Sequence, residues 1–250
     1  MASLSSEQVA FYRDQGYLIL KAVFDSQIIK SIQNDADRLL NNSDIVFPEN
    51  IRCRWQESNT PGTPLEALDP IIDLSPATHK LAYDDFLIGS IAQLLDETTY
   101  LFKDKLIYKL PGSSGYTLHQ DYITWAEFPK TCTIALVALD PSDEETGCLE
   151  LWPGWHKYGY LSPENGEYNT IPDSWMEGKQ SIMAPLQPGD VMFFNCLLPH
   201  RSAPNRSDRA RRHLYLSYHG ASDGGEQRDE YYRLQMDWFK EKFDHNRVFK

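Results

Sequence analysis

The sequence predicts a fold that is mainly β with flanking helices, and two observations indicate this class. Short apolar runs separated by Gly, Pro, Asp or Ser dominate residues 100–219. Helical patterns stand only before and after this region, so strands and helices do not alternate as in parallel α/β folds. This spacing favours an antiparallel sandwich or barrel. A chain of 250 residues that is 41% hydrophobic can bury one full core, so we expect a single domain over residues 1–250.

The N-terminal part, about residues 1–98, is expected to be helical. Ser5 precedes an amphipathic run that ends at Gly16, which predicts a capped helix. Tyr17–Leu20 then has the composition of a strand. Apolar residues near helical spacing predict a second helix over Ser26–Leu40, and a third helix fits Asp84–Leu95.

Between the second and third helices the chain is rich in Pro, Asn and Asp from Ser43 to about Pro76, which predicts mostly loop. One short strand fits Ile51–Trp55. The core of the barrel is expected over about residues 99–220, and its six strand candidates are Leu101–Leu110, Tyr116–His119, Cys132–Ala138, Cys148–Trp152, Asp190–Asn195 and His213–His219. Good helix formers then predict a C-terminal helix at about 226–242, which should cover the barrel from outside.

Composition excludes several classes of partner. A formal net charge of −12 and a pI near 5.0 argue against binding nucleic acid or an anionic membrane by bulk electrostatics. The four cysteines form no C-x-x-C pair, and the N-terminus has neither the basic nor the apolar region of a secretory leader. No run approaches the length of a membrane span. We therefore expect a cytoplasmic protein with free thiols and a small-molecule substrate, while the oligomeric state stays open.

Two imidazoles and one carboxylate are the candidates for a metal site. His119 and Asp121 are two residues apart, so on a regular strand both side chains would point to the same face. His200 follows a glycine turn and an apolar strand, and it could complete the set from a neighbouring strand. Two His and one carboxylate bind ferrous iron on one face and leave the opposite face to reactants, which points to an oxygen-using enzyme. A His-x-Asp pair alone also fits a surface histidine.

Four segments together resemble the phytanoyl-CoA dioxygenase family of iron(II)- and 2-oxoglutarate-dependent oxygenases. In chain order they are Phe11–Ile19, His119–Asp121, Thr146–His156 and His200–Arg212. The resemblance implies a double-stranded β-helix, a jelly-roll barrel of the cupin type. It also implies that Fe(II) is the metal, with 2-oxoglutarate and O2 as co-substrates.

The resemblance assigns roles to particular residues. It implies that His119, Asp121 and His200 are the catalytic iron ligands. It further implies that Arg211 binds the far carboxylate of 2-oxoglutarate, a task that suits a planar guanidinium, and that Ser202 assists. Alternation along a strand would put Arg209 on the same face as Arg211, so Arg209 and Arg212 compete for this role and only the family spacing separates the three.

Further residues are candidates for the pocket. On Leu101–Leu110 one face carries Tyr108 and the other carries Lys105, and either could reach the co-substrate, while a solvated lysine edge is the alternative for Lys103 and Lys109. Tyr122 and Trp125 follow the ligands directly and are candidates for substrate binding. One departure from the family pattern is Trp155, where a serine is more usual before His156; we expect His156 to be structural or to line the pocket, not to bind metal.

The sequence thus predicts a dioxygenase that converts 2-oxoglutarate to succinate and CO2 while it oxidises, and by default hydroxylates, a C–H bond of a small metabolite. Desaturation or ring formation would use the same centre. Two other classes stay open: a cupin-like protein that binds a metal or ligand without turnover, and a metal-dependent isomerase. The absence of a long basic tract favours a natural product or an amino-acid-like substrate over an acyl thioester.

Overall fold

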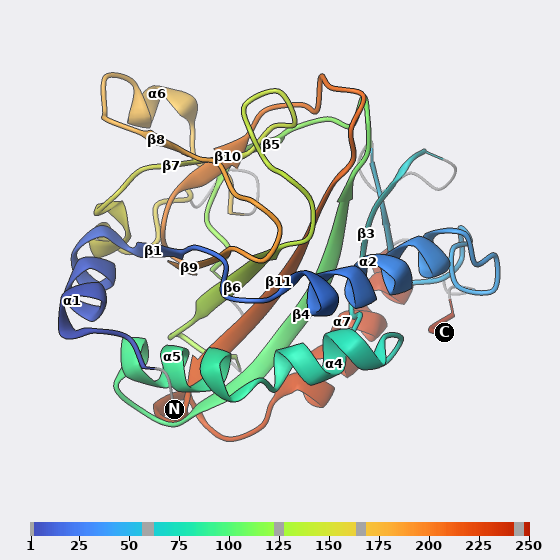
Figure 1. The fold of residues 1–250 in the computed structure, drawn as a ribbon, viewed down its shortest axis with the longest axis horizontal. Helices are drawn as coiled ribbons and strands as arrows, with labels where there is room; N and C mark the ends of the chain where they lie inside the picture. The colour runs from blue at the N-terminus through green and yellow to red at the C-terminus, as the bar shows by residue number, and fades with distance from the viewer. Residues whose placement is uncertain (1–2, 57–62, 123–127, 164–168, 243–247) are drawn as a thin grey trace.

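Two antiparallel sheets and a layer of helices build the protein (Figure 1). The computed structural model describes residues 3–56, 63–122, 128–163, 169–242 and 248–250. The helices are α1 (Ser6–Gln15), α2 (Ser26–Leu40), α4 (Pro76–Ala82), α5 (Asp85–Leu95), α6 (Asp173–Met176) and α7 (Arg228–Lys242), with 3-10 turns at Trp155–Tyr158 and Ala221–Asp223. Among the described residues, no helix combines the length and the hydropathy that a bilayer crossing requires.

The larger sheet has seven strands in the order β1-β9-β6-β11-β4-β3-β2, and the smaller has four in the order β5-β10-β7-β8. The strands of the larger sheet, in chain order, are β1 (Tyr17–Leu20), β2 (Cys53–Trp55), β3 (Leu65–Leu68), β4 (Thr99–Lys109), β6 (Thr133–Ala138), β9 (Val191–Asn195) and β11 (Arg211–Gly220). Those of the smaller sheet are β5 (Tyr116–His119), β7 (Leu149–Leu151), β8 (Ile182–Ala184) and β10 (His200–Ser202).

The two faces of the larger sheet serve different cores. Leu106 and Tyr108 of β4 and Leu214 of β11 belong to a cluster that packs against α1, α2, α4 and α5. Ile107 and Tyr215 point the other way, into a cluster shared with β7 and β8 of the smaller sheet. Because side chains alternate along a strand, every second residue of β4 and β11 faces the space between the sheets. The site described below lies on that inner face.

Local signals explain where the helices begin. Ser5 and Gln8 form a reciprocal capping box at the start of α1. Asp25 and Asp84 cap α2 and α5 by accepting hydrogen bonds from two backbone N–H groups each. Gly16 ends α1 with φ +81°, and a Cβ there would lie 2.4 Å from Nδ1 of His156, so that position requires glycine.

The expected mainly β architecture with flanking helices is confirmed, and so are the first three expected helices and the six expected strands, to within a few residues. Besides the one-turn helix α6 and the two 3-10 turns, four elements were not predicted. The stretch expected as loop contains β3 and ends at the start of α4, and the short strands β8 and β10 also carry no clear pattern of their own. Each of these strands has three or four residues, too few to show a period of two.

The C-terminal helix α7 was expected to cover the barrel from outside, and the structure adds a second role. Tyr231 and Tyr232 are buried against Phe102 of β4 and Phe128. Residues of the same helix line a cavity that reaches Asp121. The helix therefore supplies one wall of that cavity.

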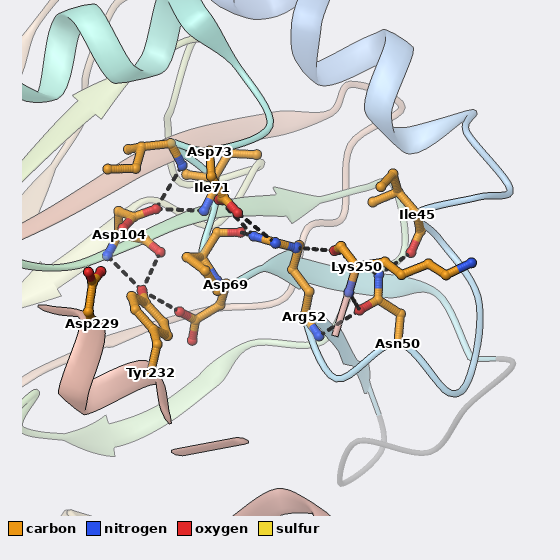
Figure 2. A network of polar contacts seen from close by, with 12 residues as sticks. Ile45, Asn50, Arg52, Asp69, Ile71, Asp73, Asp104, Asp229, Tyr232 and Lys250 are labelled. Carbon is orange, nitrogen blue, oxygen red and sulfur yellow. Dashed lines mark hydrogen bonds and ion pairs between the residues drawn. The ribbon is translucent and has the colours of Figure 1, made fainter. Parts of the chain in front are cut away.

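A buried polar network attaches α7 to the sheet, as Figure 2 shows. The Tyr232 hydroxyl accepts from the Asp104 N–H at 2.9 Å and lies 2.9 Å from both Asp69 Oδ1 and the Asp104 carbonyl oxygen, to one of which it donates. Asp104 also accepts from the Ile72 N–H at 2.8 Å and from Arg228 Nε at 2.7 Å. One strand residue thus holds both α7 and the segment that leads into α4.

The same figure shows how residues 248–250 are attached. Arg52 is almost fully buried; its Nε donates to the backbone oxygen of Lys250 at 2.6 Å, and its two terminal nitrogens pair with Asp73 at 2.7 and 2.8 Å. A parallel bridge joins Asn50 to Val248 beside it. The guanidinium also lies over the Phe249 ring, 4.2 Å from its centroid.

The network makes a stability prediction. We expect Tyr232→Phe to lower the free energy of unfolding by about 1–3 kcal/mol, because buried partners in Asp104 and Asp69 lose their hydrogen bonds while the ring is retained. Urea denaturation would measure the change. Tyr158→Phe, which removes an exposed hydroxyl, is the matched control; an equal effect of the two substitutions would contradict the role given to Tyr232.

Candidate metal and co-substrate site

His119 and His200 face each other because their strands pair. In the register of β5 with β10, His119 and His200 are direct antiparallel partners, and their ring centroids are 4.2 Å apart. Each Nδ1 lies within hydrogen-bonding distance of the carbonyl two residues before it, 2.6 Å to Thr117 O and 2.9 Å to Leu198 O. A ring that donates from Nδ1 keeps the lone pair of Nε2 for a metal.

Asp121 completes a cluster of three donors. It lies just beyond the end of β5, with Oδ1 3.7 Å from His119 Nε2 and Oδ2 3.8 Å from His200 Nε2. One donor atom from each of the three residues lies within 4.8 Å of the other two. Side chains far apart in the chain thus converge on one point, as the sequence led us to expect.

The electrostatics keep Asp121 and His200 in the forms that bind a metal. Burial alone would raise the pKa of Asp121, but the charge of Lys105 lowers it well below its usual range, so the carboxylate is ionised. Burial, followed by the neighbouring His119, lowers the pKa of His200 to about 4, so this imidazole is neutral at neutral pH. Two imidazole nitrogens and one carboxylate are a donor set that fits a divalent iron.

Gln120, between His119 and Asp121, holds the ligand segment from the opposite side. Its side chain is fully buried; Nε2 donates to Gly159 O at 2.9 Å and to Leu197 O at 2.6 Å, and Oε1 accepts from the Leu161 N–H at 2.7 Å. Leu197 directly precedes Leu198, whose carbonyl orients His200. The Gln120 side-chain amide therefore links the segment that carries His119 to the segment that carries His200. Sequence reasoning missed this residue, and its place between two candidate ligands was the only signal for it.

Arg211 is a fully buried cation with unused donors. It is the first residue of β11 and faces the space between the sheets, where Nη1 lies 3.3 Å from His213 Nδ1. Its Nε and Nη2 have no hydrogen-bond partner within the described residues, and no ion pair joins it there to a carboxylate. Burial, then the charge of Arg211, lowers the pKa of His213 well below its usual range, so His213 accepts as a neutral imidazole. Orphaned buried guanidinium donors fit a carboxylate ligand.

The two competing arginines lie elsewhere. Arg209 precedes β11, is exposed, and pairs through Nη2 with Asp143 at 2.8 Å. Arg212 points to the helix side of the sheet, where it pairs with Asp140 at 2.7 Å and with Asp37 at 2.5 Å. Both guanidinium groups are already paired with carboxylates, whereas Arg211 is not paired with any carboxylate of the described residues.

Lys109 was left open between an inward and a solvated position. The structure decides between them, because Lys109 is buried and pairs across the strands with Arg211. Its Nζ donates to Ser202 Oγ at 2.8 Å, to Gly147 O at 3.2 Å and to Ala203 O. The hydroxyl of Ser202 is thus oriented by the Lys109 amino group, which lies beside Arg211.

The other expected pocket residues divide. Lys105 faces the interior and lines the cavity with Asp121. Tyr108 does not, because its ring packs in the helix-side core and its hydroxyl donates to Ala36 O at 3.0 Å. The expectation that Tyr108 reaches the co-substrate is therefore corrected. Tyr122 lies beside the site with its ring 5.4 Å from that of Tyr160. Trp125 lies outside the described residues. His156 is structural, since it packs on Gly16 and lies 3.3 Å from Arg13 O.

A cavity of about 540 Å³ opens onto Asp121. β2, β4 and β11 supply one side of it and α7 supplies another, through Tyr231, Gln235, Trp238 and Phe239. Its size suits a small organic molecule. The contribution of α7 to this cavity could not be predicted, because a helix pattern does not tell which surface the helix covers.

Comparisons with known proteins agree with this geometry. Residues 12–213 match the model of the phytanoyl-CoA dioxygenase (PhyH) family. The 2-aminoethylphosphonate dioxygenase of an uncultured bacterium, HF130_AEPn_1, is 28% identical over 97% of this chain and 88% of its own. The methylphosphonate hydroxylase of Gimesia maris is 37% identical, but that match covers 56% of this chain and only 52% of the relative. The ectoine dioxygenase of Sphingopyxis alaskensis is 26% identical over 89% of this chain and 78% of its own.

Solved structures share the fold. EctD from S. alaskensis with 2-oxoglutarate and 5-hydroxyectoine superposes with a TM-score of 0.71 at 23% identity, over 88% of this chain and 77% of that one. The epimerase SnoN from nogalamycin biosynthesis, in complex with Fe3+, alpha ketoglutarate and nogalamycin RO, also gives a TM-score of 0.71 at 23% identity, over 86% of this chain and 83% of that one.

The buried Lys109 makes a pH prediction. Burial, then the charge of Arg211, lowers its pKa to about 7, below the ordinary value of about 10.4. Between these values the unfolded chain binds a proton that the folded chain lacks, so this lysine makes the free energy of unfolding rise with pH, by at most about 1.4 kcal/mol per unit.

We therefore expect urea denaturation from pH 7 to pH 9 to show a shallower pH dependence for Lys109→Met than for the wild type. Lys80→Met, at an exposed lysine of α4, should keep the wild-type slope. Parallel curves for wild type and Lys109→Met would show that this lysine is not titrating in that range.

Proposed function

The chain belongs to the phytanoyl-CoA dioxygenase family, and from this premise we propose that it hydroxylates a C–H bond of a small metabolite at the His119/Asp121/His200 site. It is an iron(II)- and 2-oxoglutarate-dependent dioxygenase. In the proposal the two facing sheets are the walls of a double-stranded β-helix barrel, and residues 1–250 form one domain.

When bound, iron and 2-oxoglutarate supply the oxidising chemistry, in which O2 decarboxylates the 2-oxo acid to succinate and CO2 and a substrate C–H bond is oxidised. The protein's own residues bind and orient the reactants. His119, Asp121 and His200 would hold the metal through Nε2, a carboxylate oxygen and Nε2. Arg211 would hold the far carboxylate of 2-oxoglutarate, with Ser202, oriented by Lys109, beside it. The buried walls around Arg211 keep water from competing for that carboxylate.

One observation carries this proposal: the two donors of buried Arg211 that have no partner among the described residues. Burial of an unpaired guanidinium is costly unless an anion completes it. A cupin-like protein that only binds metal, or a metal-dependent isomerase, would use the three ligands but would have no need of a second, cationic subsite for a dicarboxylate. The arginine therefore favours a 2-oxo acid dioxygenase over both alternatives.

The names of the relatives guide the choice of substrate probes. They act on 2-aminoethylphosphonate, methylphosphonate and ectoine, all small molecules. The cavity of about 540 Å³ fits molecules of this size. Hydroxylation is the reaction we propose, and product analysis by mass spectrometry would distinguish a gain of one oxygen from desaturation or ring formation.

Loss of one ligand should abolish turnover. We expect Asp121→Ala to lose iron-dependent formation of succinate from 2-oxoglutarate, because two imidazoles alone hold a divalent iron weakly and unsymmetrically. Succinate is measured by liquid chromatography after anaerobic loading with Fe(II). Asp44→Ala, at an exposed carboxylate, is the control. Wild-type turnover in Asp121→Ala would eliminate the proposed centre.

The arginine makes a separate prediction. We expect Arg211→Lys to raise the KM for 2-oxoglutarate by about ten- to a hundredfold, since an ammonium cannot replace a bidentate guanidinium–carboxylate contact. Arg209→Lys, at the exposed arginine two residues earlier, should leave this KM unchanged. The reverse pattern would assign the co-substrate to Arg209.

A further inference from the structure

Three basic side chains line the cavity that opens onto Asp121. Arg54 comes from β2, and Lys103 and Lys105 come from the inner face of β4. They lie at a different part of that face from Lys109 and Arg211, which mark the proposed 2-oxoglutarate end. The cavity is therefore cationic on the side where the substrate would enter.

The carboxylates of the cavity do not neutralise these cations. Asp69 is buried and forms ion pairs with two of the three cations, 3.3 Å from Arg54 Nη2 and 3.6 Å from Lys103 Nζ. Its Oδ1 also lies 2.9 Å from the Tyr232 hydroxyl. Lys105 makes no ion pair or hydrogen bond with any described residue, and the remaining carboxylate, Asp121, is the candidate metal ligand. With Asp121 set aside as the metal ligand, the three basic side chains of the cavity are thus matched by the single negative charge of Asp69.

A third acidic side chain lies next to this cavity. Glu66 lines the adjoining pocket together with Tyr116 of β5, and Lys103 and Lys105 line both spaces. No ion pair joins Glu66 to either lysine. With Glu66 counted, an excess of one positive charge remains on this wall.

Aromatic rings hold each cation in place. The Arg54 guanidinium lies 4.2 Å from the centroid of Phe239, Lys103 Nζ lies 5.7 Å from that of Tyr231, and Lys105 Nζ lies 5.0 Å from that of Tyr215. Such contacts attract a cation without neutralising its charge. The three groups are therefore positioned beforehand and still able to bind an anion.

We propose that this cavity selects a substrate with a phosphonate group and that Lys105, assisted by Lys103 and Arg54, binds that group. The inference rests on the proposed dioxygenase function and names its substrate class. A phosphonate near neutral pH carries up to two negative charges on three oxygens, so it can accept from several cations that approach from different strands. A carboxylate has only two oxygens, so it would leave one of the three cations without an oxygen to contact.

Isothermal titration calorimetry of protein loaded anaerobically with Fe(II) and 2-oxoglutarate would test the proposal. The probes are 2-aminoethylphosphonate and methylphosphonate, their carboxylate counterparts β-alanine and acetate, and the zwitterion ectoine. We expect the phosphonates to bind more tightly than the carboxylates, and Lys105→Met to weaken phosphonate binding about tenfold or more while Lys105→Arg retains most of it. Lys80→Met is the matched control.

The outcomes separate the two levels of inference. If the wild type forms no succinate from 2-oxoglutarate, the proposed function fails, whereas the calorimetric comparison still reads the phosphonate site. If succinate forms but the carboxylates or ectoine bind as tightly as the phosphonates, the substrate class is wrong. If Lys105→Met weakens the binding of 2-oxoglutarate itself as much as that of phosphonate, Lys105 serves the co-substrate and the assignment is overturned.

Discussion

The antiparallel pairing of β4 with β11 is the constraint on which the rest of the structure depends. Its register sets Lys109 opposite Arg211 and Lys105 opposite Tyr215. A shift of one residue would send these side chains to the helix side and bring Leu106 and Leu214 into the site. Because those leucines belong to the main core, the hydrophobic effect that stabilises the fold also keeps the polar face turned inward. The site is thus fixed by the core on the opposite face of the same strands.

Sequence reasoning went furthest where the pattern was long or the chemistry specific. The capped helices and the strands of five or more residues carry their own period, and the His119/Asp121 pair with His200 converges as expected. It failed for β3, β8 and β10, which depend on neighbours for their pairing. It also misjudged Tyr108 and left Lys109 open, since alternation divides β4 into two faces but does not say which one is inside. Lysines normally mark the solvent side; here Lys105 and Lys109 lie on the inner face, where we propose that anions bind.

The position along β4 separates two tasks. Residues on one face of a strand recur every two positions, about 6.6 Å apart. Lys105 and Lys109 are separated by two such intervals, so one small anion cannot contact both in the same way. Lys109 lies with Ser202 and Arg211, and Lys105 lies with Asp121 and the cavity. The overall charge of −12 repels anions at a distance, so their recognition depends on contacts made inside. Selectivity for the proposed phosphonate substrate would therefore depend on short-range contacts.

The attachment of Arg52 to the backbone oxygen of Lys250 spans 198 positions of the chain. Contacts between residues so far apart in sequence form slowly, because the entropy of closing a long loop is lost before the contact contributes any stabilisation. The helix that walls the cavity precedes this contact directly in sequence. During synthesis on a ribosome, every strand of the two sheets is made before this helix, so the chamber lacks its α7 wall until residues 228–242 have been added.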